Sequence, residues 1–400
     1  MRALILSNEF PPEIYGGAGV HVDELTRHMR PLIGLDIRTF GSRSEEDPGW
    51  RVRGYPPGNG LDSAPAHLKP MLSALSRDLA MVIDPVDADV VHVHTWYAHL
   101  AGILTRLAYG IPLVLTVHSL EPLRPWKREQ LGGGYDVSSW VERTAIESAD
   151  AVVAVSRETR EDVMRLFDVA PERVHVIHNG IDADFYRPDP ATEALERHGI
   201  DPAVPYVLFV GRITRQKGIV HLVRAIRHLE PGIGVVLCAG QPDTPEIAAE
   251  VEAGVRAAQA ERPNVVWIGE MVGREEVRQL YSHAAVFCCP SVYEPFGIIN
   301  LEAAACETPV VASAVGGIPE VVVDGETGLL VPVELRPDAP MSPVDPDRFE
   351  RNLAGAINAL MADAATREVM GRAARRRAVE RFSWTRIAEA TVDLYRSLLA

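Results

Sequence analysis

Short apolar runs that alternate with stretches of helical periodicity are the feature that most constrains how this chain can fold. The runs at 113–117 and 286–289 are mostly apolar, and each is followed by a turn and a longer stretch with helical spacing. Strands buried on both faces of a sheet have this composition, and strands that alternate with helices are typical of parallel sheets covered by helices. The sequence therefore predicts an α/β protein.

The predicted strands fall into two groups. The first lies at 3–6, 35–40, 90–94, 113–118, 151–155 and 174–177, and the second at 206–210, 234–239, 265–268, 286–289, 310–312 and 328–331. Between them, residues 182–205 are rich in proline and poor in periodicity, so we predict a hinge there. The 400 residues, 47% of them hydrophobic, exceed what one core usually organises. We therefore predict two Rossmann-like domains, with residues 334–346 as an irregular surface excursion.

Composition narrows the possible partners and compartment. The formal net charge of −15 repels phosphate backbones and argues against nucleic acid as a partner. The four cysteines lie in apolar stretches, which is not the pattern of a disulfide framework; they are Cys238, Cys288, Cys289 and Cys306. The apolar run within the first ten residues is too short for a signal peptide. We expect a cytoplasmic protein.

Arginines cluster between residues 27 and 53, where Glu45, Glu46 and Asp47 interrupt the positive charge. An uninterrupted basic patch would favour a membrane surface, whereas mixed charges are typical of a solvated face. We therefore do not expect association with a membrane. The arginines concerned are Arg27, Arg30, Arg38, Arg43, Arg51 and Arg53.

The glycine run after the first predicted strand is a candidate phosphate site. Gly16, Gly17 and Gly19 join this strand to a helix predicted to start near Val20. Glycines permit close approach of the backbone, and the N–H groups at a helix start attract anions. The alternative is that the glycines only tighten the turn. The run is not the dinucleotide-binding fingerprint, because its spacing is Gly-Gly-x-Gly and no acidic residue follows the second strand as that motif requires.

Two cations follow the first strand of the second domain. Arg212 and Lys217 lie in the run Gly211–Gly218, in the loop before an amphipathic helix. Arginine offers a planar fork to phosphate oxygens and lysine a compact charge, which suits a leaving diphosphate. The alternative is a solvated loop.

The run from 291 to 302 holds two carboxylates eight positions apart. Glu294 is predicted at a strand-to-helix turn and Glu302 within the helix, so that one can reach a sugar and the other ribose hydroxyls. Pro295 and Gly297 open the helix and leave backbone N–H groups available for a phosphate.

His118 ends an apolar strand, a position that predicts an imidazole at a ligand crevice rather than in the core. A structural role is the alternative. His92, His94 and His99 form another group, but their spacing fits no standard zinc motif, so we predict no metal site.

Taken together, these motifs and the run His178–Asp182 resemble glycosyltransferase family 4, and the likeness covers essentially the whole chain. The opening residues 8–21 look like the branch with actinobacterial-type glycogen synthases and maltose-1-phosphate synthases. The resemblance implies a GT-B fold of two Rossmann-like domains facing across a cleft. It implies an N-terminal acceptor-side domain at 1–185, a nucleotide-sugar donor domain at 186–381 and a helix at 382–400 that crosses back to the first domain.

The resemblance also implies roles for site residues. His118 and Glu294 would contact the transferred glucose, Arg212 and Lys217 would clamp the diphosphate, and Glu302 would bind the ribose. The backbone N–H groups of Phe296, Gly297 and Ile298 would meet the phosphates, as would the loop with Gly16 and Gly17. The implied chemistry is front-face substitution with retention, without metal or cofactor.

The resemblance implies transfer of glucose from ADP-glucose or UDP-glucose to an α-1,4-glucan or to glucose 1-phosphate. One departure is Ile14, which stands where classical bacterial glycogen synthases carry a lysine. The alternatives are another retaining hexosyltransferase of family 4, with a lipid or small-molecule acceptor, and a nucleotide-sugar epimerase. The oligomeric state stays open, a homo-oligomer included.

Overall fold

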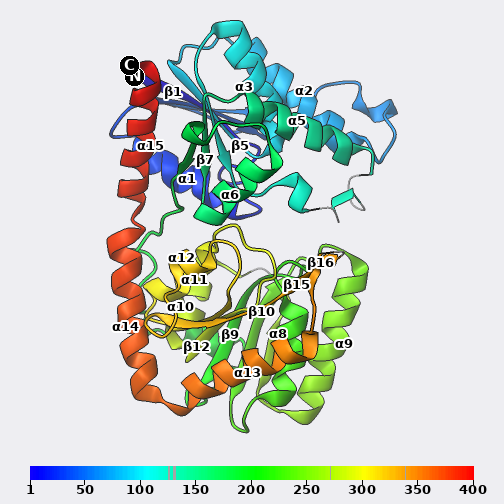
Figure 1. Ribbon diagram of the computed structural model, residues 1–400, viewed down its shortest axis with the longest axis vertical. Helices are drawn as coiled ribbons and strands as arrows, with labels where there is room; N and C mark the ends of the chain where they lie inside the picture. Colours follow the sequence, from blue (N-terminus) through cyan, green and yellow to red (C-terminus); the bar gives the residue numbers. More distant parts are fainter. Residues whose placement is uncertain (125–126, 129–131, 271, 338) are drawn as a thin grey trace. The chain divides into compact units, whose positions relative to one another are not determined.

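The computed structural model describes residues 1–124, 127–128, 132–270, 272–337 and 339–400. The chain forms two compact units (Figure 1). Unit 1 comprises Met1–Gly180 together with Trp384–Ala400, and unit 2 comprises Ile181–Ser383. Each unit contains a largely parallel sheet covered by helices. The prediction of two Rossmann-like domains is therefore confirmed.

Unit 1 is built on an eight-stranded sheet with the order β3-β4-β2-β1-β5-β6-β7-β8. All neighbouring strands run parallel except β3 and β4, which are antiparallel. Each strand predicted in this half is present, within two residues of its predicted ends. The strands are β1 (Arg2–Leu6), β2 (Gly34–Phe40), β3 (Ser44–Asp47), β4 (Trp50–Tyr55), β5 (Val90–His94), β6 (Leu113–Val117), β7 (Ala151–Ala154) and β8 (Val174–Val176).

Helices cover both faces of this sheet. The final helix is part of unit 1, because its residues Ile387 and Val392 share a buried core with Val22 and Leu25 of the first helix. These helices are α1 (Gly17–Met29), α2 (Lys69–Ile83), α3 (Trp96–Tyr109), α5 (Gly134–Ser148), α6 (Arg157–Leu166) and α15 (Trp384–Leu399).

The interpretation of the arginine cluster as a solvated face is wrong for Arg38. Its side chain is fully buried and pairs with Asp36, two residues earlier on β2, at 3.0 Å. Alternate residues of a strand lie on the same face, which brings the two charges together. The guanidinium also donates to the carbonyls of Asp84 and Pro85 at the end of α2. Arg38 therefore anchors a helix to the sheet.

Unit 2 has a six-stranded parallel sheet with the order β11-β10-β9-β12-β13-β14. Its core contains apolar residues of the strands and of the helices on either side. The four cysteines lie in this unit and are buried and free, as the sequence predicted. The strands are β9 (Tyr206–Arg212), β10 (Gly234–Gly240), β11 (Val265–Ile268), β12 (Val286–Cys289), β13 (Val310–Ser313) and β14 (Gly328–Val331).

The helices of unit 2 are α7 (Glu193–Arg197), α8 (Ile219–Ala225), α9 (Pro245–Glu261), α10 (Arg274–His283), α11 (Ile298–Ala305), α12 (Ile318–Val321), α13 (Pro346–Ala362) and α14 (Ala364–Arg381). The stretch 334–346 is not irregular, because β15 (Leu335–Arg336) and β16 (Ala339–Pro343) pair as a small antiparallel ribbon. In the described part of the chain, none of the helices combines the length and apolar character that crossing a membrane requires.

The proline-rich stretch 182–205 packs onto unit 2. Asp189 forms an ion pair with Arg278 of α10 at 2.6 Å, and the N–H of Ala194 donates to the side chain of Gln279. The chain passes between the units just before this stretch, at 180–181, and again at 383–384. The crossing therefore lies at the edge of the predicted hinge and not within it.

Candidate active site

Unit 2 gathers its predicted site residues at the carboxyl ends of two neighbouring strands. β9 and β12 are adjacent in the sheet, although β10 and β11 lie between them in the sequence. The strand order reverses at this point, with β10 and β11 on one side and β13 and β14 on the other. Open α/β sheets bind ligands in the crevice at such a switch point.

The two loops that follow these strands are packed against each other. Gly218 has a φ of +64°, and a Cβ placed on it would lie 1.9 Å from the carbonyl oxygen of Pro290. The N–H of Val292 donates to the carbonyl of Gln216 at 2.9 Å. Glycine at 218 therefore permits both the left-handed backbone and the close approach of the loops.

This approach brings Lys217 to Glu294, although 77 residues separate them. The Lys217 ammonium donates to Glu294 Oε2 at 2.6 Å, and the Ser291 hydroxyl donates to the same oxygen at 3.3 Å. The two side chains of the pair are 18% and 9% exposed. Burial acts to lower the pKa of Lys217, but the charge of Glu294 and its hydrogen bond outweigh burial and raise the pKa. Lys217 is therefore a fixed positive charge at the switch point.

Arg212 is the last residue of β9, which runs two residues beyond its predicted end at Val210. The residue therefore belongs to the strand and not to the loop after it. Its guanidinium donates to Asp243 Oδ1 at 3.0 Å. Asp243 follows β10, the neighbour of β9, so the ion pair fixes Arg212 at the carboxyl end of the sheet.

The start of α11 supplies a second kind of anion-binding group. Gly297 precedes this helix with a φ of +92°, and Phe296 is buried before it. The first turn, from Ile298, carries no acidic side chain. N–H groups in the first turn of a helix have no acceptor within the helix and attract negative charge. Cations and a helix start thus gather at one switch point, which suits a diphosphate.

Glu302 lies on α11 and accepts a hydrogen bond from the Tyr281 hydroxyl at 3.0 Å. Burial raises the pKa of Glu302, although hydrogen bonds from Tyr186 and Tyr281 oppose this shift. The two tyrosines hold the carboxyl group in place. Its contact with a ribose stays a prediction.

The glycine loop of unit 1 is already in contact with a carboxylate. Glu9 Oε2 accepts from the N–H groups of Tyr15 and Gly16 at 2.9 and 2.8 Å. A Cβ on Gly19 would lie 2.7 Å from this oxygen, whereas a Cβ on Gly16 would meet nothing within 4 Å among the described residues. Gly19 thus serves packing, while the role of Gly16 and Gly17 in donor binding stays a prediction.

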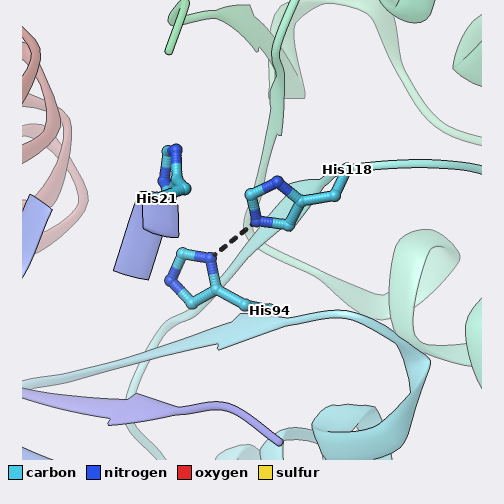
Figure 2. A group of neighbouring side chains, drawn as sticks. All are labelled: His21, His94 and His118. Atoms are coloured by element: carbon cyan, nitrogen blue, oxygen red, sulfur yellow. Dashed lines mark hydrogen bonds between the residues drawn. The ribbon is translucent and has the colours of Figure 1, made fainter. Parts of the chain in front are cut away.

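His118 directly follows β6 and is half-buried. It does not stand alone at the strand end, because its Nε2 lies 3.1 Å from Nδ1 of His94, the last residue of β5 (Figure 2). His21 of α1 lies against the same ring, with 4.7 Å between the ring centroids. Sequence spacing grouped His94 with His92 and His99 and so missed the contact with His118 and His21.

Burial favours the neutral form of all three histidines. Burial lowers the pKa of His21 to about 4, against the opposing effect of its hydrogen bond to Asn179. Burial also lowers the pKa of His94 and His118 well below the ordinary 6.5, and the neighbouring histidines add to the shift. The resulting cluster presents lone pairs and N–H groups rather than positive charge.

Thr95 is a further residue that the sequence did not point to. It has a φ of +64°, which is rare for a residue that is not glycine, and it joins β5 to α3 beside this cluster. Its hydroxyl donates to Asn8 Oδ1 at 2.7 Å, after β1. Strained backbone of this kind is concentrated at functional sites. Only the structure could show it, because local sequence pattern reveals neither the φ of Thr95 nor its contact with Asn8, 87 residues away.

Comparisons with known proteins agree with this architecture. Residues 15–185 match the family model described as Glycosyltransferase Family 4, and residues 191–377 match Glycosyl transferases group 1. The chain is 50% identical to an alpha-maltose-1-phosphate synthase of Mycolicibacterium smegmatis, with 100% of both chains covered. It is 33% identical to a D-inositol 3-phosphate glycosyltransferase of Xylanimonas cellulosilytica, covering 95% of this chain and 91% of that protein.

Solved structures show the same fold. Sucrose-phosphate synthase from Thermosynechococcus elongatus superposes with a TM-score of 0.78 at 25% identity and covers 100% of this chain and 99% of that one. The catalytic domain of Arabidopsis thaliana starch synthase IV gives a TM-score of 0.74 at 19% identity, with 100% and 99% covered. With its two Rossmann-like units of GT-B type, the chain belongs to glycosyltransferase family 4, in the branch that the alpha-maltose-1-phosphate synthases represent.

Proposed function

We propose that this glycosyltransferase moves glucose from ADP-glucose or UDP-glucose to glucose 1-phosphate and forms α-maltose 1-phosphate. The observation that carries the proposal is the 50% identity to alpha-maltose-1-phosphate synthases over the full length of both chains. The named product contains two glucose units and one phosphate, so glucose 1-phosphate is the acceptor that balances the reaction. An α-1,4-glucan is the second acceptor to be tested.

The charges of unit 2 support a nucleotide diphosphate as the leaving group. Lys217 has three N–H donors, of which Glu294 takes one, so the ammonium can also donate to a phosphate oxygen. Arg212 and the start of α11 add positive charge at the same switch point. Such groups stabilise the charge that develops as the C1–O bond to the diphosphate breaks.

The proposed reaction retains the anomeric configuration. The bond from glucose C1 to the diphosphate oxygen breaks, and a bond from C1 to the acceptor hydroxyl oxygen forms on the same face. The acceptor hydroxyl passes its proton to the departing diphosphate oxygen. Fixed cations stabilise the diphosphate in this scheme, so an excess of chelator should not lower the rate, and inhibition by the chelator that magnesium reverses would contradict the scheme.

The decisive experiment crosses donors with acceptors. The purified chain is incubated with ADP-glucose or UDP-glucose and with glucose 1-phosphate, glycogen or inositol 3-phosphate, the last because of the relatives named for that acceptor. Mass spectrometry should detect a disaccharide phosphate, and NMR should show an α-linkage. Elongated glycogen or a glycosylated inositol phosphate as the main product would refute the proposed acceptor. Release of free nucleotide diphosphate without any acceptor would instead favour a reaction that needs no acceptor, such as that of a nucleotide-sugar epimerase.

Lys217→Met tests whether the product depends on the candidate site. Arg256→Met is a matched control, because Arg256 pairs with Glu252 on the exposed surface of α9 in the same unit. Lys217→Met should lower turnover by about 10²–10³-fold, the usual effect of losing one group that stabilises a developing anion. The control should keep full activity.

A further inference from the structure

The histidine cluster of unit 1 brings together side chains from three elements. His21 comes from α1, His94 ends β5 and His118 follows β6 (Figure 2). Each offers one ring nitrogen, and these nitrogens lie within 4.8 Å of one another. His94 and His118 come from the carboxyl ends of the neighbouring strands β5 and β6, and His21 comes from α1, the helix that follows β1 on the other side of β5.

The orientation of His21 is set by a hydrogen bond on its outer side. Its Nδ1 lies 2.6 Å from Asn179 Oδ1, and an amide oxygen can only accept, so Nδ1 carries the proton. Nε2 of His21 is then a bare lone pair. It is buried and has no hydrogen-bond partner in the described part of the chain. A histidine that ligates a metal typically donates its other N–H to an oxygen in this way.

The contact between His94 and His118 brings two further ring nitrogens into the cluster. His94 Nδ1 and His118 Nε2 lie 3.1 Å apart. Two ligands of a tetrahedral zinc ion, each about 2.0–2.1 Å from the metal, are about 3.4 Å apart. The ligand nitrogens of all three histidines lie within 4.8 Å of one another, so the His21 ring must approach the other two for all three to bind one ion.

We propose that His21, His94 and His118 bind a divalent transition-metal ion, with zinc as the expected ion. Three imidazoles with one open position are an established zinc-binding arrangement, and water or an anion can take the fourth position. Imidazole ligands favour zinc, copper or nickel, whereas magnesium and calcium prefer oxygen. Asn179 is a positioning residue of this site, because it orients His21 without contacting the ion.

Metal binding has a consequence for activity that rests on the proposed function. His118 is also the side chain predicted to contact the transferred glucose, and an ion held on one of its two ring nitrogens would occupy that nitrogen and fix the orientation of the ring. Zinc should therefore inhibit the glucosyl transfer, and a chelator should restore it. The ion is a regulator in this proposal and takes no part in the reaction.

The test measures binding directly, so it does not depend on activity. The full chain, freed of metal by a chelator, is titrated with zinc by calorimetry and with cobalt by visible spectroscopy. One ion should bind, and cobalt should give the spectrum of a tetrahedral site without the charge-transfer band of a thiolate ligand. A thiolate band would place the metal at the cysteines of unit 2 and overturn the proposal, as would the absence of binding.

Variants separate ligation from a structural effect. His21→Gln removes a ligand. His28→Gln on the same helix is the matched control, since the His28 ring bonds to the Glu24 carbonyl of its own helix, with Nδ1 2.8 Å from that oxygen. Asn179→Ala keeps the three ligands and should weaken binding by about 10–100-fold, as expected when a metal ligand loses its orienting partner. His21→Gln should weaken binding at least as much, and His28→Gln should bind like the wild type. If His21→Gln and Asn179→Ala both bind zinc as tightly as the wild type does, the site is wrong, and this holds whatever the glucosyl-transfer assay shows.

Discussion

Replacing Lys217 or Glu294 should show how much the buried ion pair at the switch point contributes to the stability of unit 2. Lys217 Nζ and Glu294 Oε2 lie 2.6 Å apart. Two unit charges at this distance attract each other by about 6 kcal/mol at an effective dielectric of about 20. The loss of solvation cancels part of that attraction, and breaking a buried pair by removing one partner costs about 3–5 kcal/mol. We therefore expect Lys217→Met and Glu294→Gln each to lower the stability of unit 2 by about 3 kcal/mol.

The double variant should lose much less than the sum of the single variants. Each single change leaves a charge in a site where the two side chains are 18% and 9% exposed, whereas the double change leaves none. Charges in contact are coupled, and coupling energies of about 0.5–3 kcal/mol are usual for such neighbours. We expect a coupling near the upper end of this range, because the separation is short and the site is buried.

The assay must report on unit 2 alone, because a chain of two units need not unfold in a single transition. Native-state hydrogen exchange of the amides in β9 and β12 gives the local opening free energy of the strands that carry the pair. The control is Arg256→Met, which breaks an exposed pair with Glu252 on α9 and should change stability by at most about 1 kcal/mol. If Lys217→Met costs no more than this control, or if the single losses simply add, the ion pair does not stabilise unit 2.

Three further changes test other parts of the structure. Arg212→Ala should lower turnover by about 10²–10³-fold while circular dichroism stays that of a folded protein; activity within a few-fold of wild type would remove the residue from the site. Asp78→Asn should stabilise unit 1 at neutral pH. Burial raises the pKa of Asp78 above the ordinary 3.8, so ionisation of this carboxyl group destabilises unit 1 as pH rises from 3.8 to the folded pKa. The stability gained by Asp78→Asn, measured by urea titration, should therefore shrink as pH is lowered toward 3.8. Gly218→Ala should cost about 1–3 kcal/mol more than Gly232→Ala, since both have positive φ but only the first would contact a carbonyl oxygen, that of Pro290; equal hydrogen-exchange losses would contradict this.

The apolar strands were predictable because burial on both faces leaves a continuous apolar run in the sequence. β3 and β4 were missed for the opposite reason. β3, Ser44–Asp47, consists of polar and acidic residues at the edge of the sheet, where it pairs with β4 alone among the described strands. β4 carries Arg51 and Arg53, whose partners Asp36 and Asp84 come from other parts of the chain. From the sequence alone, the charged residues of these strands predict a solvent-exposed segment, because their ion-pair partners are not known.

The sequence could reveal the positions of the site residues but not their partners. Each strand end is a local property, so Lys217, Glu294 and His118 could be placed at the ends of strands without a structure. Their partners depend on which strands are neighbours. Along the chain, two other strands separate β9 from its neighbour β12, and three separate β1 from its neighbour β5.

Local sequence pattern therefore cannot predict the contacts at the switch point of each sheet, because the neighbouring strands there are distant in sequence. In unit 2 this joining pairs an ammonium with a carboxylate across 77 residues. In unit 1 it places His21 beside His94 and His118, and Asn179, 158 residues from His21, fixes which nitrogen of His21 carries the proton. The same topology thus produces charged chemistry in one unit and neutral imidazole chemistry in the other. Since the first suits phosphate oxygens and the second suits a zinc ion or a sugar hydroxyl, measuring which ligand each unit binds tests both assignments independently.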